Sequence, residues 1–222
     1  MAVPDAQREI GLELPSPMTL QGLQDYVARA VAAREFTQHL NEVFILMTEE
    51  LGELAREIAG KGNSPGAAEA FDDGNLAFEL ADLALYLLDL ANGFQVSLAA
   101  LWPAHEQALE QRHAAQPKGP PPGSFDPEWG LNMLVAHQGE MRNAREWGDS
   151  PEQLLTLLTG EAGKIARELR KHWKDRTTPE RAGGALIDAL RCLFRLTLAC
   201  GIDLERAVRE KEAHNAERTW EF

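Results

Sequence analysis

The stretch LAFELADLALYLLDL, residues 76–90, decides the fold class, because it is apolar around most of the circumference of a helix. A helix of that kind is buried on several sides by its neighbours. Three acids, Glu79, Asp82 and Asp89, interrupt the run. A bilayer span would not carry three acids at these positions, so the stretch predicts a core helix of a protein with no membrane partner.

Paired acids mark this helix and the segment before it. Glu79 and Asp82 stand three residues apart and therefore share one helical face. The segment TEELGELAREI, residues 48–58, places Glu50 and Glu53 in the same relation. A short loop joins the two segments, so they can run antiparallel with the pairs facing each other. Four converging carboxylates require a cation, and oxygen ligands without His or Cys favour Mg²⁺ or Mn²⁺.

Asp89 continues the acidic stripe seven residues beyond Asp82. Two interpretations stay open for it. Its side chain either supports the metal ligands from behind or lies at the exposed end of the helix.

Helical periodicity extends over almost the whole chain, and strand-like alternation is absent, which predicts an all-α fold. The segment QPKGPPPGSFDP, residues 116–127, fits neither a helix nor a central strand and is predicted to be a linker. Ser97, Ser150 and Asp203 are expected to cap helices. Eight helices are expected, at residues 19–35, 37–60, 75–94, 97–113, 131–146, 151–174, 179–200 and 203–219.

The segments on either side of the linker resemble one another, which indicates an internal duplication. Residues 48–58 align with TGEAGKIAREL, residues 159–169, at an offset of 111, and an offset of 106 pairs Asp82 with Asp188 further on. The expected bundle therefore holds two four-helix repeats packed as an internal pseudo-dimer. Its expected divisions are a flexible leader at 1–18, a first repeat at 19–113, a linker at 114–129 and a second repeat at 130–222.

The net charge of −13 argues against a general nucleic-acid or anionic-membrane surface. Residues 1–113 carry 6 basic and 18 acidic side chains, whereas residues 114–222 carry 16 and 17. The acidic excess thus belongs to the half with the paired acids. The two cysteines, Cys192 and Cys200, lie too far apart along one helix to form a disulfide there, which predicts reduced thiols and a cytoplasmic location.

The pattern of Glu50 and Glu53 followed by Glu79 and Asp82 resembles the metal signature of the MazG-like all-α nucleoside triphosphate pyrophosphohydrolases. This superfamily includes MazG-type enzymes, dimeric dUTPases and phosphoribosyl-ATP pyrophosphohydrolases. The resemblance implies that these four acids hold Mg²⁺, with Mn²⁺ as an alternative, and that Glu49 activates water. It also implies a phosphate-binding set on the last helix, matched by Lys211, Asn215 and Arg218.

The two repeats differ from this signature in complementary ways. In the second repeat Gly160, Lys164 and Ala185 stand where the first has Glu49, Glu53 and Glu79, so the second repeat should not bind the metal. The first repeat in turn lacks two of the three phosphate-binding residues. One composite site is expected, with the metal acids from repeat 1 and phosphate-binding cations from repeat 2. Lys164 and Arg195 are further candidates for substrate binding.

The resemblance implies Mg²⁺-dependent hydrolysis of a nucleoside triphosphate to the monophosphate and pyrophosphate, as nucleotide-pool housekeeping. A catalytically degenerate helical protein that senses nucleotides or binds partners is the alternative. A ferritin-like di-iron protein is disfavoured, because that architecture uses two Glu-x-x-His motifs and the one present, Glu110 to His113, sits beside the linker. Two fused chains could also pair as a homodimer.

Overall fold

The computed structural model describes residues 12–62, 73–113, 125–144 and 150–217. Within these ranges the chain forms eight α-helices, so the all-α prediction is confirmed. Their starts and ends lie close to those expected. The helices are α2 (Leu20–Ala33), α3 (Leu40–Gly62), α4 (Asp73–Gly93), α5 (Leu98–His113), α6 (Leu131–Ala144), α7 (Pro151–His172), α8 (Pro179–Cys200) and α9 (Leu204–Glu217).

Local capping explains where several helices begin. The Ser150 side chain accepts a hydrogen bond from the backbone N–H of Gln153, whose own side chain accepts one from the Ser150 N–H, so the predicted capping box is present. Ser97 and Asp203 accept from the backbone three residues later, at 3.2 and 3.0 Å. Gly201 ends α8 in the left-handed conformation, at φ 70°.

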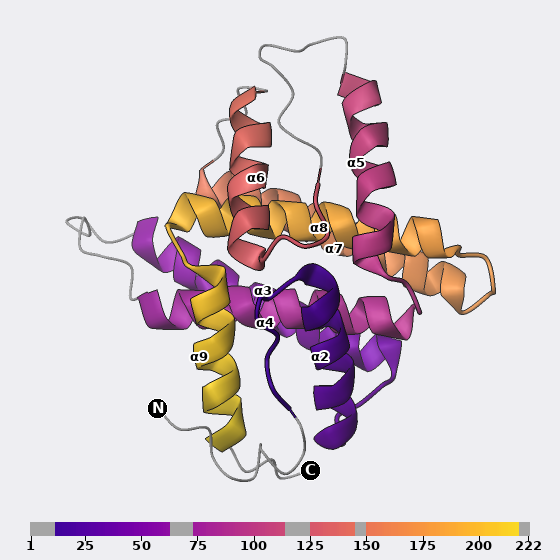
Figure 1. Cartoon of the computed structure of the whole chain (residues 1–222), viewed down its shortest axis with the longest axis horizontal. Helices are drawn as coiled ribbons and strands as arrows, with labels where there is room; N and C mark the ends of the chain where they lie inside the picture. Colours follow the sequence, from indigo (N-terminus) through magenta and orange to yellow (C-terminus); the bar gives the residue numbers. More distant parts are fainter. Residues whose placement is uncertain (1–11, 63–72, 114–124, 145–149, 218–222) are drawn as a thin grey trace.

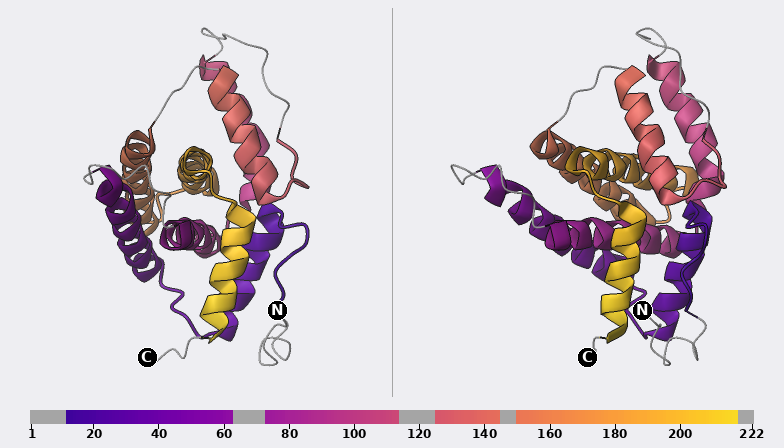
Figure 2. Two further views of the ribbon diagram at one scale, coloured as in Figure 1. Left: turned by 90° about the vertical axis from the view of Figure 1, so that its left-hand side faces the viewer. Right: turned by 60° about the vertical axis from the view of Figure 1, so that its left-hand side comes forward.

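Two helical hairpins, α3 with α4 and α7 with α8, form the centre of the molecule. They lie against each other through α4 with α8 and α3 with α7, and they run across the view of Figure 1. Shorter helices stand roughly across these hairpins, with α2 and α9 on one side and α5 and α6 on the other (Figures 1 and 2).

The last helix of each half packs on the hairpin of the other half. The helix α9 contacts α4, and α5 contacts α8. Close packing accompanies the second contact, because a Cβ at Gly183 of α8 would lie 2.3 Å from Cδ1 of Leu101 on α5. The duplication, the internal pseudo-dimer and the domain boundaries stay predictions, and residues 1–11 and 114–124 of the expected leader and linker lie outside the described residues.

The core runs continuously through both hairpins. Leu54, Leu80, Leu88 and Phe194 are fully buried, and the ring of Trp102 stacks on that of Phe194 with centroids 6.1 Å apart. Among the described residues no single helix is long and apolar enough to cross a membrane. Within the same residues, α4 and α5 taken together are long and apolar enough, but the chain bends by 100° between them.

Candidate functional site

Three of the predicted metal ligands gather where α3 and α4 face each other. Glu50, Glu53 and Glu79 each place a carboxylate oxygen so that all three atoms lie within 4.8 Å of one another. The i, i+3 spacing puts the first two on one face of α3, and the antiparallel partner α4 carries Glu79 across from them. Arg56 pairs with Glu53 at 2.6 Å, an exposed contact on the outer side of the cluster.

The electrostatics of this cluster indicate a place for a cation. Burial, and next the neighbouring Glu79 carboxyl, raise the pKa of Glu50 to about 7. Burial, followed by the nearby Asp82 and Glu53 charges, likewise raises the pKa of Glu79. Both shifts arise because negative charge is concentrated in a poorly solvated space. A bound cation would offset the repulsion between these carboxylates.

The fourth predicted ligand, Asp82, forms an ion pair with Lys211 of α9. Burial raises the pKa of Asp82 to about 6, although the Lys211 ammonium opposes the shift. The Lys211 Nζ also lies 5.4 Å from the centre of the Phe78 ring. The structure therefore brings Lys211, from the last helix of the chain, onto the acidic helix α4.

The donor set fits a hard divalent cation. All four predicted ligands offer carboxylate oxygens, which suit Mg²⁺ and Mn²⁺. One of these atoms, Oε2 of Glu79, is buried and has no hydrogen-bond partner among the described residues. A buried carboxylate oxygen left in this way is costly unless a ligand satisfies it.

A cavity of about 390 Å³ opens beside the acids and is lined by α2, α3, α4, α9 and the residues after α2. Glu49 lines it as an exposed side chain, and Asn215 contributes from α9. Away from the acids, the wall is apolar. The apolar lining residues are Val27, Ala30, Val31, Phe36, Leu46 and Leu85.

A buried carboxylate, Glu212, organises the α9 side of the cavity and was missed by the sequence reasoning. It accepts hydrogen bonds from the Tyr26 hydroxyl, from Arg34 at 2.8 Å and from Nδ2 of Asn215 at 3.1 Å. The predicted phosphate-binding Asn215 is thus held by a neighbour within its own helix. Lys211, one residue before Glu212, lies on the same helix and contacts Asp82.

An internal signal could have revealed this network. The offsets of 106 and 111 pair Glu212 with Glu106 and Tyr26 with His137. The aligned counterparts also contact each other, with Nε2 of His137 3.0 Å from Oε1 of Glu106 and both side chains buried. A side-chain contact that recurs at aligned positions of both halves indicates a positioning role.

The remaining predicted substrate-binding residues lie elsewhere. Lys164 and Arg195 belong to α7 and α8 and are not among the residues lining the cavity. Lys164 instead belongs to a polar cluster within the second hairpin. Arg218 lies outside the described residues.

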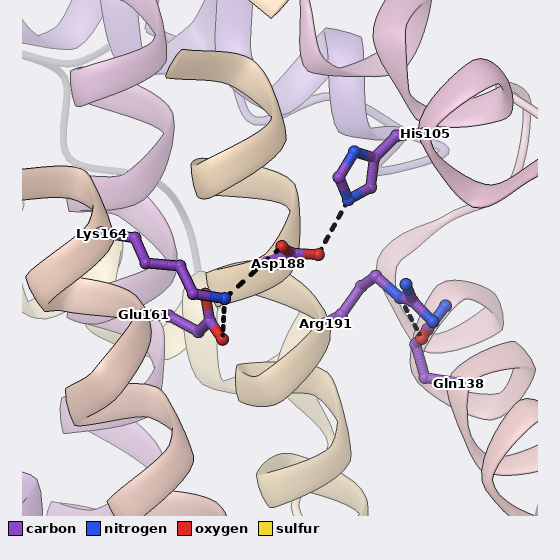
Figure 3. A network of polar contacts seen from close by, with 6 residues as sticks. All are labelled: His105, Gln138, Glu161, Lys164, Asp188 and Arg191. Atoms are coloured by element: carbon purple, nitrogen blue, oxygen red, sulfur yellow. Dashed lines mark hydrogen bonds and ion pairs between the residues drawn. The ribbon is translucent and has the colours of Figure 1, made fainter. Parts of the chain in front are cut away.

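That second cluster is drawn in Figure 3, and it includes Glu161, Lys164 and Asp188, which align with Glu50, Glu53 and Asp82. The Lys164 Nζ lies 2.8 Å from Oε2 of Glu161 and 3.9 Å from Oδ2 of Asp188. The Nε2 atom of His105, from α5, lies 2.8 Å from the other Asp188 oxygen. Although burial opposes it, the hydrogen bond to His105 lowers the pKa of Asp188. Lys164 and the His105 ring therefore pair with the acids of this cluster, whereas the acids of α3 and α4 crowd together.

An all-helical fold with paired acids facing each other across a hairpin is the arrangement that the MazG-like resemblance implies. The chain is 34% identical to dCTP pyrophosphatase 1 of Rattus norvegicus over 109 residues, a match that spans 44% of this chain and 63% of that protein. No protein-family model and no solved structure matches the chain at a significant level. The partial match and the all-helical fold together support the MazG-like resemblance.

Proposed function

We propose that this protein hydrolyses a nucleoside triphosphate between its α- and β-phosphates and releases the monophosphate and pyrophosphate. The observation that carries the proposal is the convergence of Glu50, Glu53 and Glu79 beside the ion-paired Asp82 and Lys211 at one cavity. The similarity to a protein named for dCTP pyrophosphatase activity supports the same reaction class. It makes dCTP the first nucleotide to test.

Glu50, Glu53, Glu79 and Asp82 would hold Mg²⁺ or Mn²⁺ in this reaction. A bound divalent cation supplies neutralisation of phosphate charge and a lowered pKa of water. With the cation in place, the four side chains would hold the triphosphate at the acidic end of the cavity only through that cation, because carboxylates alone repel phosphate. Their crowding makes this end unfavourable for a bare anion, so nucleotide binding should depend on added Mg²⁺ or Mn²⁺.

Glu49 is the proposed general base. It is exposed at the cavity wall, one residue before Glu50, so water can reach its carboxylate. A base so placed accepts the proton of the attacking water as the water oxygen bonds to phosphorus. This role leaves the four clustered acids free to act as ligands.

Lys211 is the proposed phosphate-binding cation. Its ammonium group has three N–H donors, so it can keep the Asp82 contact and donate to a phosphate oxygen at the same time. The positive charge would stabilise the charge that develops on the leaving pyrophosphate. Glu212, through its contacts with Tyr26 and Arg34, keeps the helix that carries Lys211 in place.

The direct test measures pyrophosphate release from dCTP by the Glu50→Gln and Glu49→Gln variants. Glu50→Gln should abolish turnover because it removes a ligand charge, and Glu49→Gln should lower kcat by about 10² to 10⁴ because it removes the base. Chelation of divalent cations should stop the wild-type reaction, and Mg²⁺ should restore it.

Glu161→Gln is the matched control, because Glu161 aligns with Glu50 but lies in the polar cluster of the second hairpin. This variant should keep its activity. Full turnover by Glu50→Gln, or equal losses in Glu50→Gln and Glu161→Gln, would refute the assignment. Nucleotide binding without any turnover would favour the sensing alternative.

A further inference from the structure

Asp89 lies in the same cavity as the proposed metal ligands but at a distance from them. It follows Asp82 by seven residues, two helical turns, which is about 10 Å along the axis of α4. Both side chains line the cavity, so they face one continuous space. A nucleotide whose phosphates lie against Glu79 and Asp82 would extend its sugar and base along α4 toward Asp89.

The Asp89 carboxylate has no partner within the described part of the chain. No hydrogen bond or ion pair joins it to another described residue, and it is half-buried. Burial alone raises its pKa to about 6, with no neighbouring charge adding to or opposing the shift. Glu212 and Glu106, by contrast, are buried and accept hydrogen bonds. Asp89 is therefore a carboxylate available to accept a hydrogen bond from a ligand.

The surroundings of Asp89 suit a flat aromatic ligand. Leu85 and Tyr86, four and three residues earlier on α4, are its helical neighbours, and both line the cavity. Tyr86 lies between Asp82 and Asp89 along α4, and burial and then the nearby carboxylates raise the pKa of its hydroxyl. Apolar side chains of α2 complete the wall. Arg34, a cation that lines the same cavity, is already paired with Glu212.

We propose that Asp89 determines base specificity by accepting a hydrogen bond from the exocyclic amino group of the nucleobase. This inference rests on the proposed function and names the substrate class, nucleotides of amino-bearing bases. An ionised carboxylate can only accept hydrogen bonds. A keto oxygen in place of the amino group would face the carboxylate oxygens with no proton between them, a mismatch that buried sites reject strongly.

The experiment compares substrates that differ in this one group, dCTP with dUTP and dATP with dITP. The wild-type protein should hydrolyse the amino-bearing member of at least one pair with a kcat/KM at least about tenfold higher. Asp89→Asn should reduce that ratio at least about tenfold, because a carboxamide can donate to a keto oxygen as well as accept. The same change of preference should appear in the Kd values of non-hydrolysable analogues measured by calorimetry.

Asp25→Asn provides the matched control, since it makes the same chemical change at an exposed position of α2 outside the cavity lining. It should leave both ratios unchanged. Turnover without discrimination in either pair, or an unchanged ratio in Asp89→Asn, would overturn the role of Asp89 and leave the hydrolase intact. If the analogues bind with the expected preference but no nucleotide is hydrolysed, the role of Asp89 in base recognition would stand and the proposed hydrolysis would be refuted. If there is neither binding nor turnover, both proposals would be refuted.

Discussion

At the scale of single residues, the cavity depends on a side chain that touches no predicted metal ligand. Glu212 is 4% exposed and gathers hydrogen bonds from Tyr26 on α2, from Arg34 just after α2 and from Asn215 on its own helix. It thereby fixes α9 against α2 with Lys211 beside Asp82. The buried carboxylate links the acidic end of the cavity to its apolar wall.

Replacing Glu212 with Gln should destabilise the protein, because Arg34 would keep its charge in a largely buried position without a counter-charge. Removal of one partner of a buried ion pair costs roughly 3 kcal/mol, measurable as a lower free energy of unfolding in urea. Glu210→Gln is the control, since the Glu210 contact with Arg206 is exposed and 4.0 Å long and should contribute less than about 1 kcal/mol. Similar losses in the two variants would contradict a buried network.

Sequence reasoning found the site residues that local spacing determines. Glu50, Glu53 and Glu79 come together because i, i+3 positions share a helical face and a hairpin aligns two such faces. The resemblance also suggested Lys211, which the structure places on Asp82. Sequence reasoning missed Tyr26, Arg34 and Glu212 because their contacts join residues far apart in the chain, 186 positions for Tyr26 with Glu212 and 178 for Arg34 with Glu212.

At the scale of elements, the helices follow from signals within a few residues of each end. The long apolar stretch became α4, and α7 begins at the Ser150 cap expected from the sequence. What the sequence did not specify is which hairpin each flanking helix covers. That choice depends on tertiary contacts such as the approach of Leu101 to Gly183, which no local pattern encodes.

The Ser150 capping box gives a test at this scale. Ser150→Ala should lower the free energy of unfolding by about 1 kcal/mol, because the backbone N–H of Gln153 at the start of α7 loses its side-chain acceptor. Ser150→Asp should retain most of the stability, since aspartate is an equally good N-cap. Equal urea midpoints for all three proteins would show that the cap does not support α7.

At the scale of the whole molecule, the two halves exchange their last helices. Residues of α9 pack on α4, and residues of α5 pack on α8, so neither hairpin is covered by its own half alone. The exchange also gives the strongly acidic half its cation, Lys211, from the nearly neutral half. The unequal charge of the two halves thus corresponds to an ion pair between them, Lys211 of the second half with Asp82 of the first.

Two separate chains, residues 1–118 and 119–222, should associate when they are co-expressed, because the exchanged helices bury apolar faces across the division. Gel filtration should recover a single complex near the mass of the intact protein, 24.5 kDa, with one cooperative unfolding transition. If each half instead eluted alone and unfolded independently, the halves would be separate domains.

Because α9 follows the other described helices in the chain, its contact with α4 can form only late in synthesis. The acids of α3 and α4 are made early in translation, yet the lysine that contacts them is added only with the last helix of the described chain. A nascent chain that stops before α9 presents crowded acids with an open flank and no Lys211. Premature stop codons anywhere before this helix should therefore yield no partly active product, and the cavity should assemble as one of the final steps of folding.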